Sequence, residues 1–373
     1  GDDAIYKDGL KIYTTLDMDA QNAAVAAMQN LPNYYTDKNG LSQPQGAIVA
    51  MNPHNGYIVA MVGGRGDDAF NRATQAERQP GSAMKPFVYL AAIQSGKTPG
   101  SIVDDSPVTF GSWSPKNYEN DFEGNMTYRY ALQHSRNVAA VKVADEVGMS
   151  KIIKLAKEMG ISTLTDQDYN LSTALGGLTH GVTPLEMVQA YGVLANGGIK
   201  VQPTAILKIV DRNGQVVEEH SIQEKRVVDE KDAAIITNML ESVINGGTGG
   251  NAAIGRPAAG KTGTTDDSKD AWFVGYTPDL VAAVWIGDDY GSETLRGMTG
   301  GDTPAIMWGQ FMANALANTP ASDFPVPSSA QSAVSEGYYN PVKARPKKEA
   351  SKDEKADKKD DKDKSKDEAV KDD

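Results

Sequence analysis

The first residues with a chemical pattern are Ser82 and Lys85, three positions apart. Pro80-Gly81 interrupts the preceding element, and Pro86 fits only near the start of a helix, so we expect Ser82 at a helix N-terminus. The unpaired N–H groups there favour an oxyanion, and Lys85 shares the helix face of Ser82. A lysine with a lowered pKa can remove the serine proton, so the pair predicts a serine acyl-transfer enzyme. An ordinary helix cap beside a solvated lysine is the alternative.

A second candidate motif is Ser135-Arg136-Asn137. Side chains two residues apart cannot share one helix face, so both reach one site only at a helix end or in a short loop. Ser135 could then pass a proton between Lys85 and a leaving amine, and Asn137 could bind a substrate amide. An ordinary surface Ser and Asn is the other interpretation.

The third motif is Lys261-Thr262-Gly263-Thr264-Thr265. In an extended strand the hydroxyls of Thr262 and Thr264 point the same way and form a row that suits a carboxylate. Gly263 would leave room for a substrate backbone, and Lys261 adds positive charge. A threonine-rich strand with a turn glycine is the structural alternative.

Each motif occurs once, in the order S-x-x-K, S-x-N, K-T-G, and this set is the signature of penicillin-binding proteins and serine β-lactamases. The sequence most resembles the transpeptidase domain of class A penicillin-binding proteins, over roughly residues 46–318. The segments that carry this closer resemblance are Phe70-Asn71-Arg72-Ala73, Thr127 to Asn137, Gly176-Gly177 through Gly197-Gly198, the K-T-G segment, and Asp270 to Tyr276. Leu10 to Asp17 is similar to the segment that joins this domain to the glycosyltransferase domain in that family.

The resemblance implies an α+β fold with an antiparallel sheet, helices on both of its faces and a helical subdomain. It also implies cross-linking of peptidoglycan stem peptides, with Ser82 attacking the penultimate D-alanine carbonyl. The backbone N–H groups of Ser82 and Thr264 would form the oxyanion hole, and Thr262 and Thr264 would hold the terminal carboxylate. The implied catalytic residues are Ser82, Lys85 and Ser135, and the implied substrate-binding residues are Asn137, Lys261, Thr262, Gly263 and Thr264.

The resemblance also sets the expected partners and location. Donor and acceptor stem peptides would be substrates, β-lactams would acylate Ser82, and no cofactor or metal is implied. A glycosyltransferase domain and a membrane anchor belong to the full-length family members but not to this sequence. The chain would then be a soluble fragment from the outer face of the bacterial cytoplasmic membrane.

Three other activities remain open. A β-lactamase needs a carboxylate that activates water, which class A β-lactamases take from an E-x-x-x-N motif. The match here, Glu241 to Asn245, comes too close before Lys261. A D,D-carboxypeptidase cannot be separated by motifs. A non-catalytic penicillin sensor would not need an intact Ser82 and Lys85.

The elements that position these motifs follow from periodicity. Strands are expected at 10–15, 46–51, 57–62, 259–264, 271–276 and 281–286, with a hairpin turn at 52–56. Helices are expected at 17–31, 82–95, 128–147, 150–159, 184–196 and 230–245. Strands at both ends and helices between them predict one antiparallel sheet with helices packed on it.

Composition narrows the class and the domain boundaries. The net charge of -12 argues against nucleic-acid binding, and the absence of cysteine excludes disulfides and a thiolate nucleophile. No signal segment or membrane-spanning run is present. We expect a lead-in module at 1–45, the transpeptidase domain at 46–318, a linker at 319–341 and a disordered charged tail at 342–373.

Several other residues attract attention but predict no separate site. The four histidines, His54, His134, His180 and His220, lack metal-ligand spacing, and His134 is expected to pack or to face solvent. The segment 246–250 lacks the ending of a phosphate loop and is interpreted as a flexible turn. Trp113, Tyr118 and Phe122 line a cleft or cover the core, with neither favoured.

Overall fold

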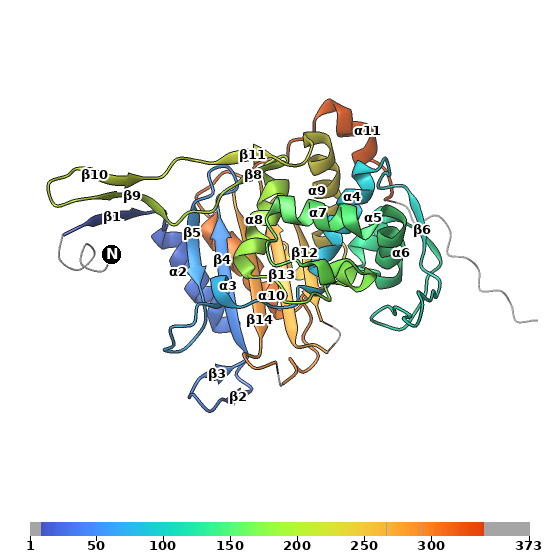
Figure 1. Cartoon of the computed structure of the whole chain (residues 1–373), viewed down its shortest axis with the longest axis horizontal. Helices are drawn as coiled ribbons and strands as arrows, with labels where there is room; N and C mark the ends of the chain where they lie inside the picture. Colours follow the sequence, from blue (N-terminus) through green and yellow to red (C-terminus); the bar gives the residue numbers. More distant parts are fainter. Residues whose placement is uncertain (1–8, 266, 292, 339–373) are drawn as a thin grey trace, which may run out of the picture.

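A five-stranded antiparallel sheet in the order β12-β13-β14-β4-β5 forms the centre of the fold (Figure 1). Its strands are β4 (Gln45–Met51), β5 (Ile58–Val62), β12 (Ala259–Thr264), β13 (Asp270–Tyr276) and β14 (Val281–Gly287). The computed structural model describes residues 9–265, 267–291 and 293–338. Because β14 pairs with β4, the sheet is assembled from both ends of the domain, as the sequence predicts.

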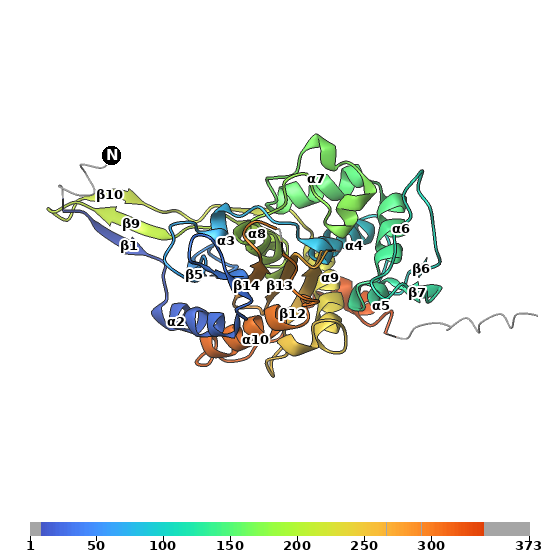
Figure 2. The same cartoon turned by 90° about the horizontal axis from the view of Figure 1, so that it is seen from below.

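Both faces of this sheet are covered by helices. Along β4, Ile48 and Ala50 belong to one hydrophobic core, whereas Val49 and Met51 belong to the other, as the two-residue period of a strand requires. Helices α2 (Met18–Ala27) and α10 (Thr303–Ala315) lie on the first face (Figure 2). Helices α8 (Pro184–Ala195) and α9 (Glu230–Ile244) lie on the second. The expected α+β class, with helices on both faces, is confirmed.

A helical region adjoins the second face next to β12 (Figure 2). It contains α4 (Lys85–Gln94), α5 (Tyr128–Gln133), α6 (Asn137–Val147) and α7 (Met149–Met159). The expected helix at 128–147 is therefore two helices, because the chain turns at Ser135, whose φ is 54°. Shorter elements are α3 (Arg72–Gln75), α11 (Gln331–Val334), β2 (Tyr35–Thr36), β3 (Ser42–Gln43), β6 (Ile102–Asp104), β7 (Asn125–Thr127), β8 (Ile199–Val201) and β11 (Glu224–Arg226). The 3-10 turns are η1 (Met28–Asn30), η2 (Gly81–Met84), η3 (Asp166–Asp168), η4 (Leu171–Leu175), η5 (Gly250–Ala252) and η6 (Ser328–Ala330).

A three-stranded arm projects from the body of the molecule (Figures 1 and 2). It consists of β1 (Lys11–Thr14), β9 (Ile206–Val210) and β10 (Val216–Glu219), with β9 in the middle. The strand expected near residue 10 is thus present, and its partner comes from about 200 residues later in the chain.

Two segments outside residues 46–318 make contacts with the domain. In the segment 1–45, α2 packs into the core beneath the sheet and β1 pairs with β9. Part of the segment 319–341 also binds to the domain. The buried Arg129 guanidinium donates hydrogen bonds to the carbonyls of Val334, at 2.9 Å, and Glu336, at 2.7 Å. The charged tail at 342–373 lies outside the described residues.

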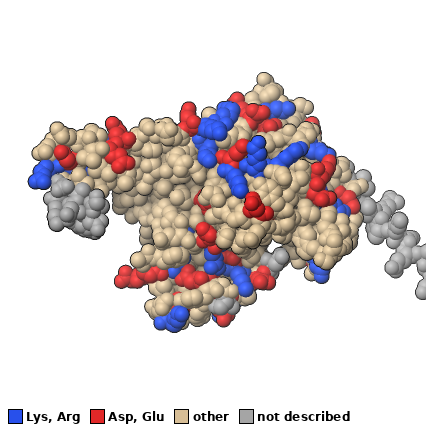
Figure 3. All heavy atoms as spheres, viewed as in Figure 1, with Lys and Arg blue, Asp and Glu red and all other residues tan. Residues whose placement is uncertain are grey.

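Surface charge and helix length are the two features that test for a nucleic-acid-binding face and for a membrane-spanning helix. On the face shown in Figure 3, acidic and basic side chains are interspersed rather than gathered in a basic stripe. Among the described residues, no helix is both long and apolar enough to cross a membrane.

Candidate active site

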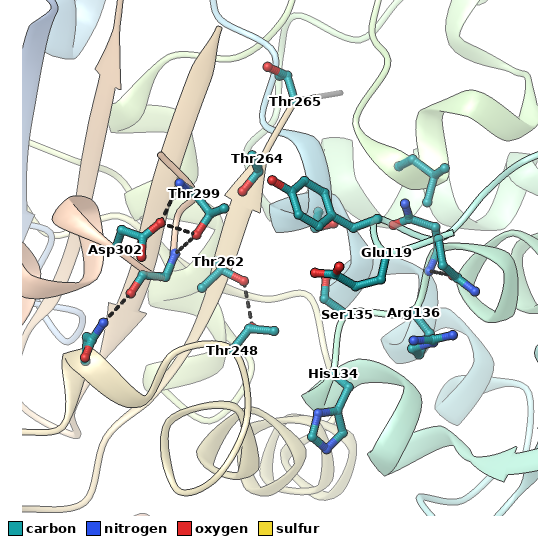
Figure 4. Close-up of a pocket in the computed structure, with 17 residues that line it drawn as sticks. Glu119, His134, Ser135, Arg136, Thr248, Thr262, Thr264, Thr265, Thr299 and Asp302 are labelled. Carbon is teal, nitrogen blue, oxygen red and sulfur yellow. Dashed lines mark hydrogen bonds between the residues drawn. The ribbon is translucent and has the colours of Figure 1, made fainter. Parts of the chain in front are cut away.

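A cleft of about 440 Å³ lies between β12 and the helical region. One wall is formed by Thr262 and Thr264 of β12 and by Thr265, which follows it. The other wall is formed by residues 117–119 and 134–137. Ser82 lines this space, and Figure 4 shows Thr262 and Thr264 facing Ser135 across it. All three sequence motifs therefore contribute to one cavity.

Ser82 lies in the 3-10 turn η2, not in the first turn of an α-helix as expected. Gly81, with φ of 55°, starts this turn, and α4 begins at Lys85, whose N–H bonds to the Ser82 carbonyl. Pro86 is in the first turn of α4, where its missing N–H costs little. Ser82 is half-buried, whereas Lys85 is fully buried one turn later.

Glycines let the backbone of η2 approach its neighbours without intervening side chains. A Cβ at Gly176, whose φ is 80°, would lie 2.3 Å from the Gly81 carbonyl oxygen, and one at Gly263 would lie 2.3 Å from that of Pro80. The space on the Cβ side of Gly263 therefore holds the chain's own η2 turn, and contact of this glycine with a substrate backbone stays a prediction. Gly300 packs with equal closeness against Gly263. These contacts fix the Ser82 turn against β12.

The S-x-N motif occupies the junction between α5 and α6, which meets the condition under which both side chains can reach one site. Ser135 adopts a left-handed conformation that is costly for a residue with a Cβ. Asn137 is the first residue of α6. This bend turns the Ser135 hydroxyl and the Asn137 carboxamide toward the same lysine.

Two buried lysines converge on the Ser135 hydroxyl. Its Oγ lies 3.1 Å from Nζ of Lys85 and 2.9 Å from Nζ of Lys261, and both lysines are 0% exposed. Lys85 also donates to the carbonyl of Ser135 and, at 2.6 Å, to Oδ1 of Asn137. A hydroxyl oxygen can accept two hydrogen bonds and still donate its own proton. Ser135 is therefore placed to connect the two amines.

Burial changes the protonation of Lys261. Removal from water lowers the pKa of its amine to about 7, because the charged form loses hydration. Its hydrogen-bond acceptors are neutral: the Ser135 hydroxyl, and the Thr262 carbonyl at 3.1 Å. The amine is thus close to half protonated at neutral pH, and an anion brought beside it would favour the charged form.

The wall opposite β12 is held by a buried polar network that sequence reasoning missed. The Asn117 carboxamide donates to both oxygens of Asp105 and accepts from the backbone N–H groups of Asn137, at 2.8 Å, and Val138, at 3.1 Å. Asp105 also binds the Arg136 guanidinium, at 2.6 Å. Asn117 therefore caps α6 and fixes the loop before the S-x-N motif. The residues of this network come from separate segments of the chain, so no short motif in the sequence indicates it.

The β12 wall presents hydroxyl groups to the cleft. Thr262 and Thr264 both line it, as expected for a row, and the Thr262 hydroxyl lies 2.8 Å from that of Thr248. Thr248 comes from the glycine-rich segment interpreted only as a turn. Thr264 Oγ1 accepts from the N–H of Gly300, at 3.0 Å. The neighbouring Asp302 accepts two hydrogen bonds, from the backbone and the hydroxyl of Thr299.

The remaining candidates take peripheral positions. His134 lines the cleft edge and stacks on Tyr130, and burial lowers its pKa. Tyr118 lines the cleft, whereas Trp113 packs near Phe110. Glu241 lies on α9 and is not among the described residues that line the cleft. Its carboxylate accepts a hydrogen bond from Asn238 of the same helix. No described cluster of His, Cys, Asp or Glu could hold a metal ion.

Comparison with known proteins places this geometry in a family. A model of the penicillin binding protein transpeptidase domain matches residues 46–301. Penicillin-binding protein 1A of Aquifex aeolicus is 40% identical over 76% of this chain, which spans 40% of that relative.

Two solved structures are similar along most of their length. The PonA1 protein of Mycobacterium tuberculosis in complex with penicillin V has a TM-score of 0.78 and 31% identity, covering 87% of this chain and 90% of that one. Penicillin-binding protein 1A of Haemophilus influenzae has a TM-score of 0.80 and 25% identity, covering 88% and 70%. The chain belongs to the penicillin-binding protein transpeptidase family, with the class A proteins among its relatives.

Proposed function

We propose that this chain is a D,D-transpeptidase that cross-links peptidoglycan stem peptides through an acyl-enzyme on Ser82. The observation that carries the proposal is the convergence of Lys85 and Lys261 on the Ser135 hydroxyl, beside a cleft into which Ser82 opens. A serine nucleophile, a buried amine that can act as its base and a hydroxyl that can relay a proton together support serine acyl transfer.

In the first half-reaction, Ser82 Oγ attacks the carbonyl of the penultimate D-alanine, and Lys85 takes the hydroxyl proton. The N–H groups of Ser82 and Thr264 stabilise the oxyanion. This role is supported by the close packing of Gly81 on the Thr264 backbone. The bond to the terminal D-alanine then breaks, and Ser135 passes the proton from Lys85 to the leaving amine.

Binding of the donor relies on the opposite wall. Thr262 and Thr264 donate their hydroxyl protons to the terminal carboxylate, and Lys261, whose Nζ lies 3.3 Å from Thr262 Oγ1, stabilises that negative charge. Asn137 holds Lys85 through its oxygen, and its amide nitrogen, which donates to the Lys116 carbonyl at 2.9 Å, has a second N–H for the substrate. In the second half-reaction, an amine of a neighbouring stem peptide attacks the acyl-enzyme and releases Ser82.

The chain spans about 40% of the length of the curated relatives that it matches. We propose that the full-length protein carries a glycosyltransferase domain and a membrane anchor and works on the outer face of the cytoplasmic membrane. β-Lactams would acylate Ser82 as mimics of the donor.

The test combines labelled penicillin with a stem-peptide reaction. We expect one stable penicillin adduct on Ser82 by mass spectrometry, its loss in Ser82→Ala, and a decrease of about 10³-fold or more in the acylation rate of Lys85→Ala. Labelling that survives Ser82→Ala refutes the nucleophile. With a stem-peptide donor and an amine acceptor, dimers indicate transpeptidation and shortened monomers alone indicate a carboxypeptidase. An adduct that clears within seconds indicates a β-lactamase.

A further inference from the structure

Two of the residues that face β12 across the cleft sit at the tip of a hydrogen-bonded turn with a buried base. Asn117 is buried and bound to Asp105, and the N–H of Asn120 closes the turn on the Asn117 carbonyl at 3.0 Å. Tyr118 and Glu119 are both exposed and both line the cleft. The buried anchor therefore presents two exposed side chains at a fixed place in the cleft, rather than on a loose loop.

Glu119 is an anionic group without a partner on this wall. Among the described residues, its carboxylate makes no hydrogen bond or ion pair. The second carboxylate of the cleft, Asp302, is engaged by Thr299 on the other side. The nearby cation Arg136 is already neutralised by Asp105, with Asp121 at 3.0 Å. Figure 4 shows Glu119 projecting from the helical side toward the strand that carries Thr262 and Thr264.

The two walls thus differ in the charge that they attract. The β12 wall offers hydroxyl donors with the Lys261 amine 3.3 Å from one of them, which suits the carboxylate of a donor peptide. The opposite wall offers a carboxylate that is not already paired with a cation. The second substrate of a transpeptidase is an amine, which is an ammonium ion at neutral pH. Resting on the function proposed above, we propose that Glu119 is a specificity-determining residue that binds the ammonium group of the acceptor beside the acyl-enzyme.

The binding step leaves the chemistry of transfer balanced. The bound ammonium loses one proton to solvent and attacks the ester carbonyl as a neutral amine. Its second proton passes through Ser135 and Lys85 to the oxygen of Ser82 as the ester bond breaks and the amide bond forms. Glu119 raises the local concentration of the cationic acceptor and takes no covalent part, so it favours aminolysis over hydrolysis.

The experiment measures how the acyl-enzyme partitions between water and amines. Wild type and Glu119→Gln are acylated with a thioester donor ending in D-alanine, and products are separated by mass spectrometry. The acceptors are a D-amino acid amide, which is cationic, and hydroxylamine, which is uncharged at neutral pH. We expect Glu119→Gln to lower the ratio of aminolysis to hydrolysis about two- to fivefold for the cationic acceptor, as for one exposed ion pair. The ratio with hydroxylamine should not change.

Controls separate this inference from the proposed function. Glu158→Gln, on α7 and outside the cleft wall, should keep the wild-type ratio, and Glu119→Asp should retain part of the preference. High salt should reduce the preference of the wild type but not that of Glu119→Gln. Equal ratios for wild type and Glu119→Gln, or equal losses with both acceptors, overturn the role of Glu119. A wild-type enzyme that forms no amide product at all overturns the transpeptidase assignment instead.

Discussion

The buried Lys261 amine should lower the stability of the folded protein, and replacement by methionine tests this. Methionine has a similar length and no charge, so Lys261→Met fills the same buried space. The wild-type amine must be largely stripped of water on folding, which is why its pKa falls to about 7 from an unfolded value of 10.5. The variant removes this cost and also removes hydrogen bonds to Ser135 and Thr262.

The magnitude follows from proton linkage. Between pH 7 and 10.5 the unfolded chain binds more protons at Lys261 than the folded chain, so wild-type stability rises with pH in this window. At pH 7 the depressed pKa lowers the unfolding free energy of the wild type by about 4 kcal/mol. Lys261→Met regains this amount but loses about 2 kcal/mol with the two hydrogen bonds. We expect Lys261→Met to be more stable by about 2 kcal/mol at pH 7, with the advantage gone by pH 9.

Urea denaturation at pH 6, 7, 8 and 9 provides the measurement, with penicillin acylation as the activity assay. The variant should be the more stable protein at pH 7 and acylate far more slowly. The informative quantity is the difference in unfolding free energy between the two proteins. If that difference does not change by about 2 kcal/mol between pH 7 and 9, the amine is not held near a pKa of 7 and the reasoning fails.

Three further predictions concern the cleft and its supports. The acylation rate with penicillin, divided by the rate with its methyl ester, should fall about fivefold from pH 6 to pH 9. Lys261 loses its charge above pH 7, and a charged donor binds a carboxylate about 1 kcal/mol better than a neutral one. A ratio that stays constant over this range would contradict the role of Lys261. Gly176→Ala should lower stability by about 2 kcal/mol or more and slow acylation, since its Cβ would meet Gly81. Gly255→Ala, with φ of 70° but open space, is the matched control in thermal unfolding, and equal losses would refute the packing argument. Asn117→Ala should cost about 1–3 kcal/mol in urea unfolding by leaving the N–H groups of Asn137 and Val138 unpaired, and an unchanged midpoint would speak against this cap.

Local patterns predicted most of the fold. Strand β12 runs over the expected residues 259–264, and β13 and β14 each differ from expectation by one residue. The turn between α5 and α6 is not predicted as a boundary, because helix periodicity continues across it. Tertiary bonds from Lys85 to Ser135 and Asn137 contribute to holding the left-handed bend. Strand β1 was found, but its partner β9 could not be, since pairing over such a distance leaves no local trace.

The site was predicted as a set of motifs, and its supports were not. Ser82, Lys85, Ser135 and Lys261 were singled out because reactive side chains at short spacing have a recognisable pattern. Asn117, Asp105 and Thr248 act through folded contacts between distant segments. Gly263 was assigned to a substrate because a glycine in a strand signals a close approach, yet the sequence does not say which backbone approaches.

The pairing of β4 with β14 has a consequence for synthesis of the chain. Residues 45–51 are made before their partner at 281–287, which emerges from the ribosome more than 200 residues later. Until then, the apolar hairpin of β4 and β5 keeps one edge unpaired, which is the kind of strand that joins another chain. Nascent chains that stop before β14 should therefore depend on a holding chaperone, whereas chains that extend past it can close the sheet.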